Sequence, residues 1–191
     1  MYPVGDVPRL ICSDTLFLLE SVEAIVLAWL SGFPFGWAPP RGFDPTRAAL
    51  AGAAASVAYA AEMYVDMAVT GSKFDDIQLI EGALRGKRAR APILGMALHL
   101  LNGAALGEVY AAVAAPRLPG PSWLKGVLFG ALFLLAVWPS VPLVDKYHPL
   151  IKRGELPRLN RRVAFGQNVA RHLVFGVVLA LLYQPKEPRL G

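Results

Sequence analysis

Four apolar stretches, each long enough to cross a membrane as a helix, constrain the fold of this chain more than any other feature of its sequence. An α-helix rises about 1.5 Å per residue, so about 20 apolar residues cover the roughly 30 Å of hydrocarbon in a bilayer. The chain has 191 residues, of which 55% are hydrophobic, more than the core of a soluble domain of this size requires. We therefore predict an all-α fold, a polytopic transmembrane helical bundle of four spans. The predicted spans cover residues 48–69, 92–115, 123–144 and 163–183.

Prolines and a helix-capping aspartate mark the ends of these spans. Asp44 and Pro45 precede the first span, and an N-cap oxygen followed by proline at the first helical position favours helix initiation. Pro139 and Pro142 lie in the third span and predict a kink or break near its end, because proline removes a backbone donor. The simplest domain organisation is one bundle over residues 45–191.

The amino-terminal segment, residues 1–44, contains one further apolar stretch at residues 15–37. Glu20 and Glu23 interrupt this stretch, and a glutamate at the centre of a bilayer is costly. An amphipathic helix can instead lie in the membrane interface. The sequence leaves both interpretations open: an interfacial helix, or a fifth span.

Lysine and arginine residues are concentrated in two of the linkers between the spans. Residues 70–91 and 145–162 hold most of them, including the run RGKRAR from Arg85 to Arg90. Because basic loops stay in the cytoplasm, we predict a multi-pass protein of the cell inner membrane with both linkers cytoplasmic and the carboxyl terminus outside. The same residues predict contact with anionic lipid headgroups. They do not indicate a nucleic-acid partner.

One pattern of residues occurs in both the second and the fourth predicted span. It reads H-L-x-x-G-x-x-L-x-x-x-Y, from His99 to Tyr110 and again from His172 to Tyr183. Its histidine, glycine, leucine and tyrosine fall on one face of a helix, so the pattern describes a packing surface. A span and a basic linker precede each copy. We therefore interpret the chain as a duplicated helical hairpin, an internal repeat.

Small residues at four-residue spacing predict close contacts between helices. In lipid, van der Waals contact between closely spaced backbones replaces much of the hydrophobic drive that packs helices in water. The contacts could join spans within the bundle, two copies of the chain in a homo-oligomer, or the chain and a larger membrane complex. The predicted packing glycines are Gly52, Gly95, Gly103, Gly107, Gly126, Gly130 and Gly176.

Charged and amide side chains are few within the spans, and a charge at mid-bilayer costs about 2.5–3.5 kcal/mol on insertion scales. Function is therefore expected among them. Counting residues from the cytoplasmic helix ends places Glu62, His99 and His172 at similar depths, about 10–14 Å into the membrane. We predict that they join one nearly charge-balanced cluster. Its predicted members are Glu62, Asp66, His99, Asn102, Asn168, Arg171 and His172.

Three functions fit such a cluster. A structural clasp would pair the charges and fix the register of the helices. A small proton-coupled or solute transporter would use the acids and histidines as a polar path. A haem-binding protein would use His99 and His172 as axial ligands of haem b. The sequence favours the first function, so we predict a structural or accessory membrane component with no cofactor.

The sequence lacks the signatures of enzymes and of metal sites. Cys12 is the only cysteine, so neither an intrachain disulfide nor a thiolate cage can form. The motifs of zinc proteases, serine hydrolases, phosphate-binding loops and dinucleotide-binding folds are missing. The sequence therefore leans against an enzyme, and no metal site is predicted. His148, in the second basic linker, is predicted to be an ordinary surface histidine.

The order of these features resembles uncharacterised small four-span bacterial membrane proteins. The resemblance rests on a first span of small residues with the late Asp66, and on the shared pattern in the second and fourth spans. It covers about residues 45–185. It implies a four-helix bundle in the cell membrane with no assigned activity, and it carries no catalytic residue to this chain.

Overall fold

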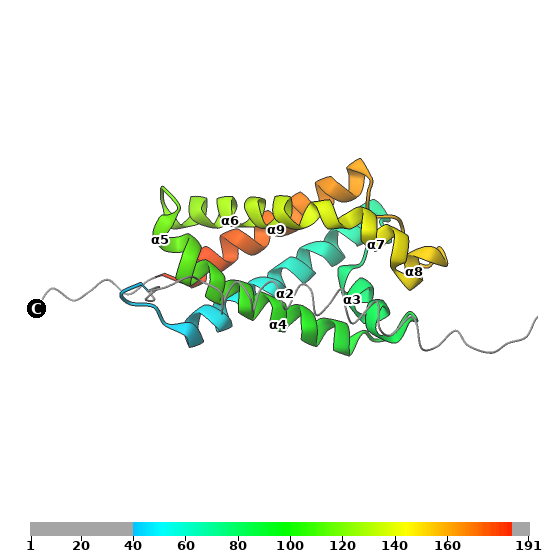
Figure 1. The fold of residues 1–191 in the computed structure, drawn as a ribbon, viewed down its shortest axis with the longest axis horizontal. Helices are drawn as coiled ribbons and strands as arrows, with labels where there is room; N and C mark the ends of the chain where they lie inside the picture. The colour runs from blue at the N-terminus through cyan, green and yellow to red at the C-terminus, as the bar shows by residue number, and fades with distance from the viewer. Residues whose placement is uncertain (1–39, 185–191) are drawn as a thin grey trace, which may run out of the picture.

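The computed structural model describes residues 40–184, and within this range every regular element is helical (Figure 1). Four segments are long and apolar enough to cross a membrane, so the predicted all-α transmembrane bundle is confirmed. The stretch at residues 15–37, for which an interfacial helix and a fifth span were both open, lies outside the described residues. The four segments are Pro45–Thr70, Ile93–Arg117, Ser122–Tyr147 and Arg162–Leu182.

Two of these segments are single helices, and the other two are composite. The third breaks at Pro139 and Pro142, which lack the backbone N–H that a continuous helix needs. The break predicted from these prolines is confirmed. The elements are α2 (Pro45–Thr70), α3 (Asp76–Arg85), α4 (Ile93–Val109), a π-helical turn (Tyr110–Ala114), α5 (Ala115–Arg117), α6 (Ser122–Val137), a 3-10 turn (Trp138–Ser140), α7 (Val141–Tyr147), α8 (Pro149–Lys152) and α9 (Arg162–Leu182).

Local chemistry sets both ends of α2. The Asp44 side chain accepts a hydrogen bond from the backbone N–H of Arg47 at 3.0 Å, and Pro45 lies in the first turn. At the other end, Gly71 adopts a φ of 70°, and its N–H donates to the carbonyl of Met67. Residues with a Cβ atom rarely adopt this left-handed conformation, so glycine ends the helix there.

A helix that the sequence did not predict, α3, lies in the first basic linker. Asp75 caps it by accepting a hydrogen bond from the backbone N–H of Gln78 at 2.9 Å, and Gly86 ends it at a φ of 64°. The helix packs against α4, where the buried carboxylate of Glu81 accepts a hydrogen bond from the Gly95 N–H at 2.6 Å. Because α3 is short and amphipathic, it gives no long apolar signal in the sequence.

The spans pack in the order α4, α2, α9, α6 (Figure 1). Helix α2 lies in the middle and contacts both α4 and α9, and α6 packs against α9. Between the second and third segments, the main contacts are made by the π-helical turn and α5 with α6. The bundle is therefore least closely packed along the side between α4 and α6.

Glycine residues make the closest approach in each pair of helices. A Cβ atom on Gly103 would overlap the hydroxyl of Ser56, and one on Gly52 would overlap the backbone of Gly103. In the other pair, Gly126 and Gly176 lie against each other's backbone. These contacts bring α2 close to α4 and α6 close to α9, as expected where small side chains let backbones approach.

The other packing glycines also face neighbours within the chain. Gly95 lies against the backbone of α3, Gly107 against Ala48, and Gly130 against the backbone of His172. The predicted glycine strips therefore serve contacts inside the bundle. The matched Gly103 and Gly176 occupy similar places in the two pairs, but the duplication of a hairpin stays a prediction.

His148 is not the surface histidine that the sequence predicts. It is buried at the start of α8, and its Nε2–H donates to the backbone carbonyl of Leu79 on α3 at 2.8 Å. Burial lowers the pKa of His148 from its ordinary value of 6.5, although the hydrogen bond to Leu79 opposes the shift. The prediction failed because the contact between α8 and α3 joins two linkers far apart in sequence.

We expect His148 to make the protein less stable as the pH falls below about 6.5. The imidazole takes up a proton near pH 6.5 in the unfolded chain, but only at lower pH when it is buried, so the unfolded state binds more protons in between. The contribution of His148 is therefore present above pH 6.5 and is lost as the pH falls through the lowered pKa of the folded state. Unfolding by denaturant at pH 7.5 and pH 5.0 measures it. His148→Gln should reduce the difference, and equal pH dependence in both proteins would contradict the prediction.

Candidate functional site

The polar cluster is built around Arg171, which lies on α9 and is 0% exposed. Its Nη1 atom is 2.9 Å from Oδ2 of Asp76, and its Nη2 atom is 3.0 Å from Oδ2 of Asp66. Oε2 of Glu62 lies 3.7 Å from Nε. Glu62 and Asp66 are one turn apart on α2, whereas Asp76 begins α3. One guanidinium thus connects three helices.

Further hydrogen bonds hold these groups. Gln167 Nε2 donates to Oδ2 of Asp66 at 2.7 Å, and the hydroxyl of Tyr59 donates to Oδ2 of Asp76 at 2.8 Å. The guanidinium carbon of Arg171 lies 4.7 Å from the centre of the Phe74 ring, a cation–π contact. Charges removed from water need such partners, because an unpaired charge in a low-dielectric interior is very costly.

The cluster contains more acid than base. Three carboxylates surround one guanidinium, and neither Oε2 of Glu62 nor Nε of Arg171 makes a hydrogen bond to any described residue. Glu62 is therefore the most weakly held of the three acids. Among residues 40–184, no group of three or more histidine, cysteine, aspartate or glutamate side chains is arranged to hold a metal ion.

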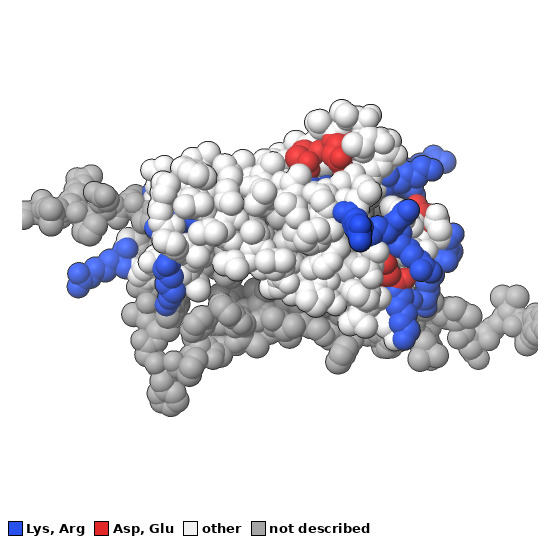
Figure 2. Space-filling model, turned by 90° about the horizontal axis from the view of Figure 1, so that it is seen from above, with Lys and Arg blue, Asp and Glu red and all other residues white. Residues whose placement is uncertain are grey.

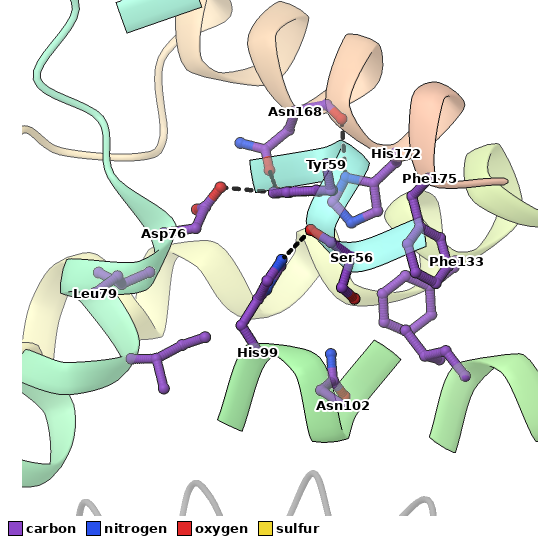
Figure 3. A pocket seen from close by; sticks show the side chains of 12 residues that line it. Ser56, Tyr59, Asp76, Leu79, His99, Asn102, Phe133, Asn168, His172 and Phe175 are labelled. Atoms are coloured by element: carbon purple, nitrogen blue, oxygen red, sulfur yellow. Dashed lines mark hydrogen bonds between the residues drawn. The ribbon is translucent and has the colours of Figure 1, made fainter. Parts of the chain in front are cut away.

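The two histidines lie beside this cluster and pack against Tyr59 (Figure 3). Ring centres are 5.1 Å apart for Tyr59 and His99, and 5.3 Å apart for Tyr59 and His172. His99 Nε2 is 3.2 Å from the backbone oxygen of Ser56, and His172 Nδ1 is 2.8 Å from that of Asn168. A carbonyl oxygen only accepts, so these nitrogens carry the hydrogen. The other nitrogen of each neutral ring is then an acceptor.

A cavity of about 210 Å³ lies next to the histidines (Figure 3). Phe133, Phe175 and Leu106 form part of its apolar wall. Asn102 also lines it and is exposed on α4, so the cavity reaches the surface there. Its polar lining consists of Ser56, Tyr59, Asp76, His99, Asn102, Asn168 and His172.

The residues predicted to form one cluster fall into two neighbouring groups. Glu62, Asp66 and Arg171 belong to the ion-paired group, whereas His99, Asn102, Asn168 and His172 line the cavity. Neither histidine pairs with a carboxylate among the described residues. The predicted charge balance had assumed that a protonated histidine could pair with one of the acids.

Two residues that the sequence did not single out join these groups. Tyr59 packs against both histidines and donates to Asp76, which in turn pairs with Arg171. Tyr59 lies three residues before Glu62 and so on a similar helical face, a signal that could have found it. Asp76 lies in a polar linker, and no local pattern marks it as a partner of a span.

Fold and site together define a small multi-span membrane protein with a buried ion-paired cluster beside a polar cavity. Residues 44–189 match the model of DUF6789, a family of unknown function, and the chain belongs to this family. Neither a curated protein nor a solved structure shows significant similarity to the chain.

Proposed function

We propose that the chain is a structural or accessory component of a membrane, and that the Arg171 cluster fixes its fold rather than conducting ions or solutes. The packing beyond the cavity supports this most directly. Tyr110, only 1% exposed, packs on Phe129 and Tyr183 with ring centres 5.3 and 6.5 Å apart, and Leu179 is fully buried beside them. A transport path would need polar, hydrated groups through this layer.

The cavity itself argues against haem. At about 210 Å³ it is smaller than the roughly 300 Å³ at the lower end of sites for drug-sized ligands, and a porphyrin is larger than most of these. Haem ligation by His99 and His172 is therefore the less favoured alternative. The ion pairs of Arg171 with Asp66 and Asp76 instead suit a group that holds three helices together.

An accessory role also fits α6, one of the two outer spans. Helix α6 packs mainly against α9, and its Leu132 and Leu135 side chains are 55% and 59% exposed. In a membrane these side chains contact lipid or another helix. We propose a larger membrane complex as the partner that this face would meet.

The proposed membrane is the inner membrane of a bacterial cell, with linkers 70–91 and 145–162 in the cytoplasm and the carboxyl terminus outside. Figure 2 supports this orientation, because basic side chains crowd one end of the molecule. Beyond a small acidic patch, a broad uncharged band separates them from the few basic side chains at the other end. The crowded end would also contact anionic headgroups.

A flux measurement tests the proposal against transport. The full chain is reconstituted into vesicles that enclose a pH-sensitive dye, and a proton gradient is imposed. We expect acidification at the rate of protein-free vesicles, because the apolar layer around Tyr110 offers no path for protons. A protonophore added at the end shows that the vesicles hold the gradient. Faster acidification by the wild type that Asp66→Asn abolishes would contradict the proposal and favour a proton-coupled transporter.

A further inference from the structure

We propose that the cavity beside the histidines binds a single-ring phenol that enters from the lipid between α4 and α6. The size of the cavity sets the first limit on the ligand. An apolar cavity of about 150 Å³ can hold a benzene molecule, and this one has about 210 Å³. The space therefore admits one six-membered ring with a polar substituent. Phe133 and Phe175 line it and offer aromatic contact to such a ring.

The polar atoms that face the cavity select the substituent. His99 and His172 each hold one ring hydrogen against a backbone carbonyl, which leaves one acceptor nitrogen on each neutral ring. His99 is only 8% exposed, and within residues 40–184 neither second nitrogen has a hydrogen-bond partner. Neither nitrogen is sealed off by protein atoms, so each is free to accept a hydrogen bond from a donor in the cavity. A ligand that carries an O–H group would supply that donor.

The position of Asn102 indicates the route by which the ligand would enter the cavity. It lies in the least closely packed side of the bundle, it is exposed, and its side-chain amide makes no hydrogen bond to any described residue (Figure 3). Within a membrane-spanning segment, an amide that lacks a protein partner is stabilised by a hydrogen bond to a polar group in the cavity that it lines. The oxygen of a phenol could accept from this amide while its O–H donates to an imidazole. A phenol meets both demands, whereas an ether or a hydrocarbon of the same size does not.

The test compares 4-fluorophenol with 4-fluoroanisole, which has the same ring but no O–H. Each probe is titrated into the full chain in lipid nanodiscs and followed by ¹⁹F NMR, with empty nanodiscs as the partition reference. We expect a saturable response for the phenol and binding of the anisole that is weaker by about fivefold or more, because it lacks the donated hydrogen bond. Identical, non-saturable responses of the two probes would overturn the proposal without any variant.

Two substitutions locate the site. Asn102→Leu and His172→Phe each remove one polar group, and each should weaken binding of the phenol by about fivefold. Leu101→Ala, at an exposed neighbouring position, should leave it unchanged. Phenol binding of wild-type strength in both polar variants would overturn the proposal. The proposed accessory role does not depend on this result, since a cavity that binds no phenol leaves the close packing around Tyr110 in place.

Discussion

Replacing Arg171 by methionine should lower the free energy of unfolding by about 3–5 kcal/mol. Methionine fills much of the same space, but it leaves three carboxylates close together without their cation. Removing one member of a buried ion pair is costly because the partner charges stay desolvated, and here two of them approach Arg171 to 2.9 and 3.0 Å. Equilibrium unfolding of the purified protein in mixed micelles by added denaturing detergent measures the change.

Two further variants separate the loss of charge from the loss of packing. Arg158→Met changes an exposed arginine in the same way and should stay within about 0.5 kcal/mol of the wild type. Adding Asp66→Asn and Asp76→Asn to Arg171→Met should recover part of the stability, because fewer carboxylates then lack a cation. If the single variant unfolds like the wild type, or if the two asparagines make it still less stable, the ion-paired cluster does not hold the bundle as we infer.

Replacing Gly176 by leucine should cost about 3 kcal/mol or more, at or beyond the upper end of ordinary overpacking. A Cβ atom on Gly176 would overlap the backbone of Gly126, and backbone atoms cannot move aside as a flexible side chain can. Helices α6 and α9 would have to separate along the face on which they pack. Equilibrium unfolding under the same conditions should show the loss as an earlier transition.

A second glycine on α9 provides a matched control for this substitution. Gly166 lies on the same helix, and an added Cβ atom there meets nothing within 4 Å. Gly166→Leu should therefore be neutral or slightly stabilising, because leucine favours the helix more than glycine does. Equal losses in both variants would mean that the close approach of α6 and α9 does not determine stability.

The prolines and glycines show why much of the fold could be predicted. Pro139 and Pro142 break the third span because each lacks one backbone donor, a property that depends on no other part of the chain. Gly103 and Gly176 lie where helices come closest, because only small residues allow that approach. Hydropathy, helix-capping residues and the spacing of small residues are properties of short stretches of sequence. The spans, their ends and their close contacts could therefore be predicted from the sequence alone.

The site was only partly predictable, because some of its contacts join residues that are far apart in the sequence. Glu62, Asp66 and Arg171 could be singled out because charge is rare inside an apolar span. Asp76 could not, because an aspartate in a polar linker is ordinary until α3 folds back against the spans. His148 was misjudged in the same way, since its burial depends on a contact between two linkers.

The amino-acid sequence was enough to predict a bundle of helices long and apolar enough to cross a membrane, because the length and hydropathy of a span are local properties. Which polar groups meet became known from the folded arrangement of the helices. Asp76 and Arg171 lie 95 positions apart, yet their side chains are 2.9 Å apart. Partners at such separation are chosen by the packing of whole helices, which no short stretch of sequence specifies.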